Sequence, residues 1–296
     1  MSAVPAPPPP RRRRRVGVVG FGQLGQFLVD RIVHDPAGRA AFELAFVWNR
    51  SADRVASSGL VPPSAVCRDL ADARAFAPDV IVEVCHPDVL RQYGAALLLV
   101  ADLYMGSPTG FADPATEAAL RAAAAAGPHG LYVPTGALWG AGDIARMADR
   151  GTLRALCVTM KKHPASLKLE GQLGEAVAAL LAAGTPGESV LYRGPVRGLC
   201  PLAPNNVNTM AAAAIAGHSL GFDGTTAVLV SDPSLAAHVI TVDVTGPPSP
   251  DGGVFRVVTE RVNPAPPGAV TGAATFVSFF SSLFAAAGRG AGVHLC

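Results

Sequence analysis

The chain has 296 residues, of which 50% are apolar and 16% are charged, so it is long enough for one large or two ordinary domains and too apolar to be a disordered protein. The net charge is +2, but Arg11–Arg15 supply five of the positive charges and the first fifteen residues contain no acid. Without that run the net charge is −3, which argues against a nucleic-acid-binding domain.

Residues 1–15 are expected to form a disordered leader. Pro7–Pro10 favour an extended polyproline conformation, and the adjacent arginines of Arg11–Arg15 repel one another. The run could be a nuclear-localisation or acidic-surface signal, but we favour a solubilising tail because such motifs produce many false matches. No apolar stretch of the length found in secretory signals follows the arginines.

The chain has five widely spaced cysteines, at positions 67, 85, 157, 200 and 296. No C-x-x-C pattern or Cys/His cluster has the spacing of a zinc site, so no metal site is expected. Free thiols are typical of a reducing compartment, and we expect a cytoplasmic protein.

Residues 16–140 alternate apolar runs with helical patterns. The expected strands are Val16–Gly20, Glu43–Trp48, Asp79–Cys85, Leu97–Ala101 and Gly130–Val133. A helix is expected over Gln26–Val33, and another begins at Pro114 with Asp113 as its N-cap and ends at Gly127. This alternation predicts an α/β fold with a doubly wound parallel sheet, the Rossmann type.

The first strand leads into Gly20-Phe21-Gly22-Gln23-Leu24-Gly25. In a G-x-G-x-x-G loop the first glycine makes the tight turn, the second lets a pyrophosphate approach the backbone, and the third lets the helix pack on the strand. The N–H groups at the helix start, at Gln23 and Leu24, can then hold the anion. A plain strand–helix turn is the alternative, but the context favours dinucleotide binding.

The second strand ends at Asn49-Arg50-Ser51, where a carboxylate would select NAD by binding its ribose. A carboxylate would also repel the 2′-phosphate of NADP, whereas Arg50 would attract it. The cofactor is therefore expected to be NAD or NADP, with Arg50 as an ordinary solvated residue being the alternative.

After about residue 140 the pattern becomes rich in β-structure, which predicts a second α+β domain over residues 141–268 with a mixed, mainly antiparallel sheet. Residues 269–296 begin with a one-faced helix, because Phe276, Phe279, Phe280, Leu283 and Phe284 recur at helical spacing. That helix is expected to pack back on the first domain rather than to span a membrane.

Three segments of the second half carry candidate site residues, namely Asn206-Val207-Asn208, Asp232-Pro233 with His238 following, and Lys161-Lys162-His163. The asparagines could be ligands or helix caps. His238 could be structural, and the basic cluster at a strand end could be solvated. Upstream, Pro134–Gly140 follows a strand at the sheet edge where doubly wound folds bind ligands, or is an interdomain linker.

These segments and the glycine loop occur in the order found in the L-aspartate dehydrogenase family, which the chain resembles from about Val16 to its last helix. The resemblance implies NAD(P)-dependent oxidative deamination of aspartate. It implies a cofactor site lined by Ala137 and by Asn206 or Asn208, and a catalytic histidine at His238. It also places Lys161 first among the candidates for binding the dicarboxylate substrate, with Lys162 and His163 beside it.

The chain departs from the family at two places. The spacer between Asp232-Pro233 and His238 is shorter, and the segment before the last helix, Pro266–Gly272, lacks a lysine. Two other hypotheses therefore stay open: a cofactor-binding sensor or partner protein without catalysis, and an imine or dihydrodipicolinate-type reductase. We expect a homo-oligomer, in particular a dimer, that binds neither nucleic acid nor membranes.

Overall fold

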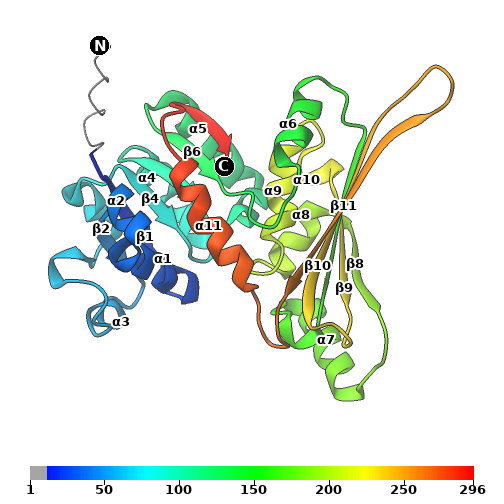
Figure 1. The fold of residues 1–296 in the computed structure, drawn as a ribbon, viewed down its shortest axis with the longest axis horizontal. Coiled ribbons are helices and arrows are strands. Elements are labelled where there is room, and N and C mark those ends of the chain that lie inside the picture. The colour runs from blue at the N-terminus through cyan, green and yellow to red at the C-terminus, as the bar shows by residue number, and fades with distance from the viewer. Residues whose placement is uncertain (1–11) are drawn as a thin grey trace, which may run out of the picture.

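The computed structural model describes residues 12–296. They form two domains that lie side by side, each built on its own sheet (Figure 1). Pro7–Pro10 and Arg11 of the expected leader lie outside the described residues.

The first sheet has seven strands and every neighbouring pair is parallel. In spatial order they are β12 (Gly292–Leu295), β6 (Gly130–Val133), β5 (Asp102–Met105), β4 (Val80–Glu83), β1 (Arg14–Val19), β2 (Phe42–Trp48) and β3 (Val66–Cys67). The chain order reverses between β1 and β4, which is the switch point where open α/β sheets bind ligands. The expected Rossmann sheet is confirmed.

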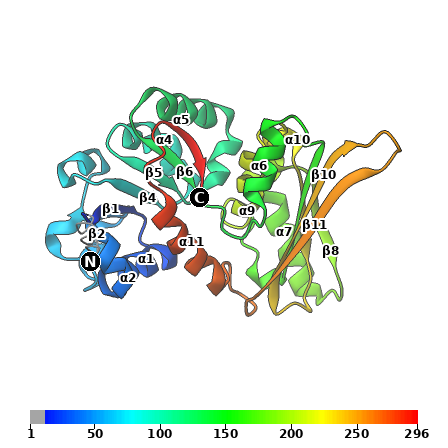
Figure 2. The same ribbon diagram turned by 45° about the horizontal axis from the view of Figure 1, so that its top comes forward.

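Helices cover both faces of this sheet (Figures 1 and 2). They are α1 (Gln23–His34), α2 (Pro36–Ala41), α3 (Ala52–Ala56), α4 (Pro87–Leu98), α5 (Pro114–Ala126) and α11 (Ala273–Ala285), with 3₁₀ turns at Pro63–Ala65, Leu70–Phe76 and Pro108–Ala112. The sequence signals for α5 are correct, because the Asp113 carboxylate accepts the N–H of Thr116 and Pro114 occupies the first turn.

The expected leader boundary at residue 15 is wrong, because β1 begins at Arg14. The Arg14 guanidinium donates to the carbonyl oxygens of Leu283 and Ala286 at the end of α11, where the helix leaves its last carbonyls unpaired. Arg15 pairs with Glu43 at 2.6 Å. These contacts offset the repulsion between neighbouring arginines.

The expected strand at Leu97–Ala101 is also wrong. Leu97 and Leu98 end α4, and the strand begins at Asp102. An apolar run of this length suits a buried helix end as well as a strand, because Leu97, Leu98 and Ala101 are all buried in either case.

The second sheet has five strands, and three of its four neighbouring pairs are antiparallel. In spatial order they are β11 (Val254–Pro264), β10 (Ala237–Pro248), β7 (Ala155–Lys162), β9 (Thr226–Ser231) and β8 (Ser189–Pro195). Its helices are α6 (Ala141–Asp149), α7 (Gly171–Ala183), α8 (Val196–Leu199), α9 (Asn208–Ala216) and α10 (Gly221–Gly224), with 3₁₀ turns at Pro164–Ser166 and Cys200–Leu202. The mixed, mainly antiparallel sheet is confirmed.

The chain returns to the first sheet at its C-terminal end (Figure 2). Helix α11 packs beside α1 on one face of that sheet, where Phe279 meets Tyr104 edge-on and Leu283 is fully buried. Strand β12, which the sequence did not predict, then pairs with β6. Within residues 12–296 no helix is both long and apolar enough to cross a bilayer.

Candidate functional site

The glycine loop has the geometry of an anion-binding turn. Gly20 has a φ of +113°, which a side chain would strain, and a Cβ on Gly25 would lie 2.1 Å from the Gly20 carbonyl oxygen. A Cβ on Gly22 would meet nothing within 4 Å, so the space over this residue is open. Gly22 is the N-cap of α1, and within the described residues no side chain caps this helix end, so its first N–H groups remain available to an anion. These residues fit a dinucleotide pyrophosphate.

Asn49, Arg50 and Ser51 follow β2 beside this loop. The Asn49 side chain accepts the Phe21 N–H at 3.3 Å and donates to the Ser51 carbonyl at 3.2 Å, so it braces the glycine loop. Arg50 is exposed and forms no ion pair with the residues that the structure describes. Its guanidinium is therefore free to meet a phosphate.

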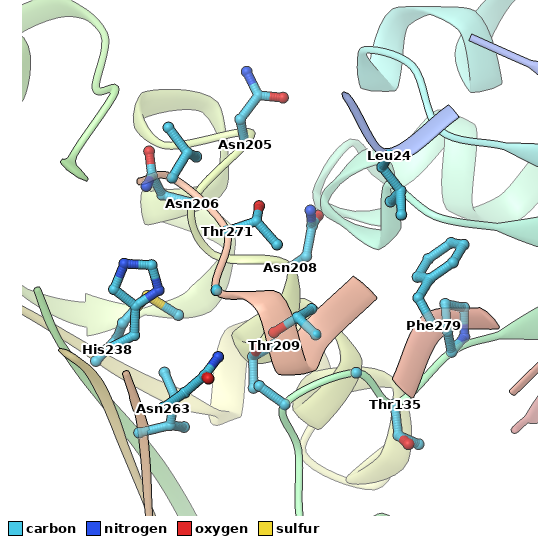
Figure 3. Close-up of a pocket in the computed structure, with 18 of the residues that line it drawn as sticks. Leu24, Thr135, Asn205, Asn206, Asn208, Thr209, His238, Asn263, Thr271 and Phe279 are labelled. Carbon is cyan, nitrogen blue, oxygen red and sulfur yellow. The ribbon is translucent and has the colours of Figure 1, made fainter. Parts of the chain in front are cut away.

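A cavity lies between the two sheets, where the carboxyl edge of the first faces the end of the second (Figure 3). From the first domain it is lined by Leu24, Gly106, Pro108 and the segment Pro134–Ala137. From the second domain and the chain that follows it, the lining residues are Met160, Lys162, Asn205, Asn206, Asn208, Thr209, His238, Ile240, Arg261, Asn263, Val270, Thr271 and Gly272. Thr275 and Phe279 of α11 complete it. The glycine-loop helix and His238 thus face one cavity.

His238 is buried at 6% exposure on the inner face of β10. Its Nε2 lies 2.9 Å from the Ala269 carbonyl oxygen. Because a carbonyl only accepts, the neutral ring carries its proton on Nε2 and leaves Nδ1 as an acceptor. Burial and the nearby Lys162 charge lower the His238 pKa to about 4, so the ring is neutral at physiological pH.

The basic cluster divides between the two faces of β7, because side chains alternate along a strand. Lys162 is buried at 4% exposure in the cavity, where its Nζ donates to the Val270 carbonyl at 3.1 Å. Burial lowers its pKa to about 8, which keeps it largely cationic at neutral pH. Lys161 lies on the opposite face and pairs with Glu188 at 2.5 Å. The structure therefore brings Lys162, and not Lys161, to the cavity.

His163 also lies away from the cavity. Its Nδ1 accepts the Ala165 N–H at 3.1 Å and so caps the 3₁₀ turn Pro164–Ser166. A backbone N–H that uses this nitrogen as its acceptor gives the ring a local structural role.

Asn206 and Asn208 both line the cavity but differ in their partners. The buried Asn206 amide accepts the Lys168 N–H at 2.9 Å and donates to the Ser166 carbonyl at 3.1 Å, so it holds two backbone segments together. Asn208 begins α9 and has one long contact, 3.4 Å from the Thr109 hydroxyl to its Oδ1. Asn208 consequently keeps more hydrogen-bonding capacity for a ligand.

Besides Arg261, Asn205 and the threonines that line the cavity, two buried polar groups in or behind it were not found from the sequence. Asn263 on β11 lies directly opposite His238 in the strand pairing and is buried at 8% exposure. A Cβ on Gly272 would lie 2.1 Å from the Asn263 amide nitrogen, so this glycine lets the chain pass over the asparagine. The second group is Glu83, a buried acid at the end of β4. Glu83 could have been identified from the sequence, because it is a charged residue inside an otherwise apolar strand.

Within the described part of the chain, residues 12–296, no group of three or more His, Cys, Asp or Glu side chains is placed to hold a metal ion. The five cysteines are free.

Comparisons with known proteins match both halves of the chain. Residues 20–134 match the homoserine dehydrogenase NAD-binding domain, and residues 143–282 match the family described as aspartate dehydrogenase, C-terminal. A protein from Xenopus tropicalis called aspartate dehydrogenase domain-containing protein is 54% identical over 95% of this chain and 98% of its own length. An L-aspartate dehydrogenase from Ralstonia nicotianae is 29% identical, covering 78% of this chain and 84% of that protein.

Among solved structures, aspartate dehydrogenase from Thermotoga maritima has a similar fold, with a TM-score of 0.64 and 18% identity. The match covers 94% of this chain and 98% of the other. The likeness extends over both domains.

Proposed function

The chain belongs to the aspartate dehydrogenase family, and from that premise we propose that it oxidatively deaminates L-aspartate with NAD or NADP, or aminates oxaloacetate in the reverse direction. The observation that carries the proposal is the shared cavity, where a neutral His238 and a cationic Lys162 face the edge of a dinucleotide-binding sheet. A proton acceptor and a buried cation beside a hydride acceptor suit the oxidation of an anionic amino acid.

Lys162 would bind a substrate carboxylate. Its buried ammonium has three donors, and among the described residues its one hydrogen-bond partner is the Val270 carbonyl. A carboxylate would satisfy the remaining donors by charge-assisted bonds. The resemblance placed Lys161 first among the candidates for binding the substrate. In this proposal Lys162 has that role instead.

His238 would accept a proton from the substrate amine at Nδ1 while Nε2–H remains bonded to Ala269. The bound nicotinamide supplies the acceptor for the hydride that leaves the α-carbon. The product would be iminoaspartate, which water hydrolyses to oxaloacetate and ammonia, and His238 would also assist that water. Asn208 and Asn263, which line the cavity, would orient the substrate or the nicotinamide amide.

The choice between the two cofactors depends on Arg50. No carboxylate stands at the end of β2 to repel a 2′-phosphate, and the exposed Arg50 would attract one. We expect both NAD and NADP to bind.

The test is the change in absorbance at 340 nm, run with aspartate and each oxidised cofactor and then with oxaloacetate, ammonia and each reduced cofactor. Turnover of aspartate supports the proposal. Cofactor binding without turnover of either substrate would favour the non-catalytic sensor instead. Turnover of other imines alone would favour the reductase hypothesis.

A second copy of the chain is the proposed partner. The face of the second sheet away from α6 and α9 exposes Val190, Val258 and Val262 at 60%, 51% and 58%. Val258 and Val262 lie on the edge strand β11 and Val190 on β8 at the opposite edge of the sheet. Exposed apolar side chains across such a face mark an interaction site, and a C₂ dimer would pair the face with itself. Light scattering after size-exclusion chromatography should give a dimer mass, and Val258→Lys with Val262→Lys should give a monomer.

The proposed compartment is the cytoplasm. Five free cysteines, of which Cys67 and Cys200 are buried, are typical of a reducing environment. Fractionation of cells that express the chain would test this, and recovery in an oxidising compartment would contradict it.

A further inference from the structure

Glu83 is a buried acid that the proposed chemistry does not use. It ends β4 and its side chain is fully buried, at 0% exposure. Its Oε1 accepts the Cys85 N–H at 2.6 Å, and its Oε2 accepts the Ser107 N–H at 3.2 Å and the Ser107 hydroxyl at 2.6 Å. All three partners donate, which suits an ionised carboxylate. Among residues 12–296 no cation lies within ion-pair distance of it.

This carboxylate lies directly behind one wall of the cavity. Ser107, which holds it, stands between Gly106 and Pro108, and both of these line the cavity. The Gly106 N–H donates to the Glu83 carbonyl at 2.7 Å, and a Cβ on Gly106 would lie 2.3 Å from that oxygen. One layer of backbone therefore separates the acid from the space where, under the proposed function, the nicotinamide lies.

We propose that the Glu83 carboxylate makes the site discriminate between the redox states of the cofactor, by favouring the oxidised form over the reduced form. The oxidised nicotinamide ring carries a positive charge and the reduced ring is neutral, while the rest of the molecule keeps the same charge. An unpaired carboxylate in a region of low dielectric therefore attracts one form and not the other. The inference rests on the cofactor-binding part of the proposed function and not on the identity of the substrate.

The charge of Glu83 varies in a useful pH range, because burial raises its pKa to about 7 against the opposing effect of its three donors. The Cys85 thiol beside it stays neutral, since burial raises its pKa to about 12, and Arg50 faces that thiol from the loop after β2. Across the cavity stand the neutral His238, the Lys162 ammonium and Arg261, whose guanidinium donates to the Gly136 carbonyl at 3.4 Å. The preference for the oxidised cofactor should rise as pH increases through about 7, because Glu83 then loses its proton.

The experiment measures the dissociation constants of NAD⁺ and NADH for the purified chain, by calorimetry and by NADH fluorescence. The variant Glu83→Gln removes the charge but keeps the size and one set of hydrogen bonds. We expect the ratio of the NADH constant to the NAD⁺ constant to fall about tenfold, mainly through weaker NAD⁺ binding. An acid that only braces the two loops would weaken both forms equally, and an unchanged ratio would overturn the proposal.

The control variant is Ser107→Ala, which removes a hydrogen bond to the carboxylate. Because that bond lowers the Glu83 pKa, the control is measured at about pH 9, where the carboxylate is ionised in both proteins and the ratio should stay near the wild-type value. A second measurement needs no change at Glu83. In Lys162→Met, where the neighbouring ammonium cannot titrate, the ratio should rise between about pH 6 and about pH 8. A flat ratio would contradict the inference even if Glu83→Gln failed to fold.

The two proposals can fail separately. If the chain showed the expected ratio of dissociation constants but did not turn over aspartate, the substrate assignment would be wrong and the inference about Glu83 would stand.

Discussion

The two sides of the cavity are built in different ways. The first-domain side comes from short segments at strand ends, and its main feature, the loop Gly20–Gly25, is continuous in sequence. The second-domain side combines Lys162 of β7, His238 of β10 and Asn263 of β11, which come together only when the sheet forms. The first side has the parts to hold a cofactor, and the second has the parts for proton transfer and substrate charge. Substitutions on the two sides should therefore separate binding of the cofactor from turnover.

The largest effect is expected at His238. His238→Asn keeps approximate size and polarity but cannot take up a proton near neutral pH. General acid–base groups typically contribute about 10²–10⁴-fold, so kcat should fall by that order while cofactor affinity stays nearly constant. Steady-state kinetics and cofactor titration measure the two quantities. Wild-type turnover in the variant would remove His238 from the mechanism.

The next effect separates two adjacent lysines. Lys162→Met removes a buried cation from the cavity and should lower kcat/KM for aspartate by about 10–100-fold, the usual range for a hydrogen bond to a charged group. Lys161→Met is the matched control, because Lys161 lies on the other face of β7 and pairs with the exposed Glu188. Its effect on kcat/KM should be small. The reverse result would show that Lys161 binds the substrate after all.

The glycine loop offers a comparable pair on the first-domain side. Gly22→Val fills open space where the pyrophosphate would lie and should weaken cofactor binding at least about tenfold without unfolding the chain. Gly25→Val should instead destabilise the fold, because its Cβ would lie 2.1 Å from the Gly20 carbonyl oxygen. Calorimetry and thermal melting distinguish the outcomes. Equal cofactor affinity in folded Gly22→Val would refute the assignment of this loop.

The pH profile of turnover should follow the second-domain side. Because the His238 pKa is lowered to about 4, turnover should persist as pH falls through 6.5, the ordinary value for histidine. On the alkaline side, loss of the Lys162 proton near pH 8 should raise KM for aspartate. Rates of the wild type and of Lys162→Met, measured across this range, test both limbs. With oxidised cofactor kept saturating, so that protonation of Glu83 does not limit cofactor binding, a fall in kcat/KM centred near 6.5 would mean that His238 is not buried as described.

The smallest effect is expected at Arg50, which follows β2 beside the glycine loop. Arg50→Ala should weaken NADP more than NAD, because NADP alone carries the 2′-phosphate. An exposed arginine contributes modestly, so a difference of only a fewfold between the two dissociation constants is expected. Equal losses would show that Arg50 does not contact that phosphate.

Most of the fold was predictable because its signals are local. The glycine loop, the Asp113-Pro114 helix start and the β-rich second half each follow from neighbouring residues. The strand expected at Leu97–Ala101 was wrong because an apolar run does not distinguish a helix end from a strand. Strand β12 was missed because its pairing with β6 joins segments far apart in the chain.

The candidate site was less predictable than the fold. His238 and the asparagines could be named, but choosing between Lys161 and Lys162 requires the phase of β7, since one position reverses the face. Asn263 could not be found without its register against His238. Arg14 and Arg15 were assigned to the leader because their acceptors, the end of α11 and Glu43, lie elsewhere in the chain.

Under the proposed function, the two sides act together to remove a hydride from the α-carbon of aspartate. The most direct measurement supplies L-aspartate deuterated at that carbon with oxidised cofactor and determines the mass of the reduced cofactor. We expect the reduced nicotinamide to carry the deuterium in the wild type and in Lys161→Met, and His238→Asn to form it far more slowly. Absence of reduced cofactor, or reduced cofactor without deuterium, would rule out this hydride transfer.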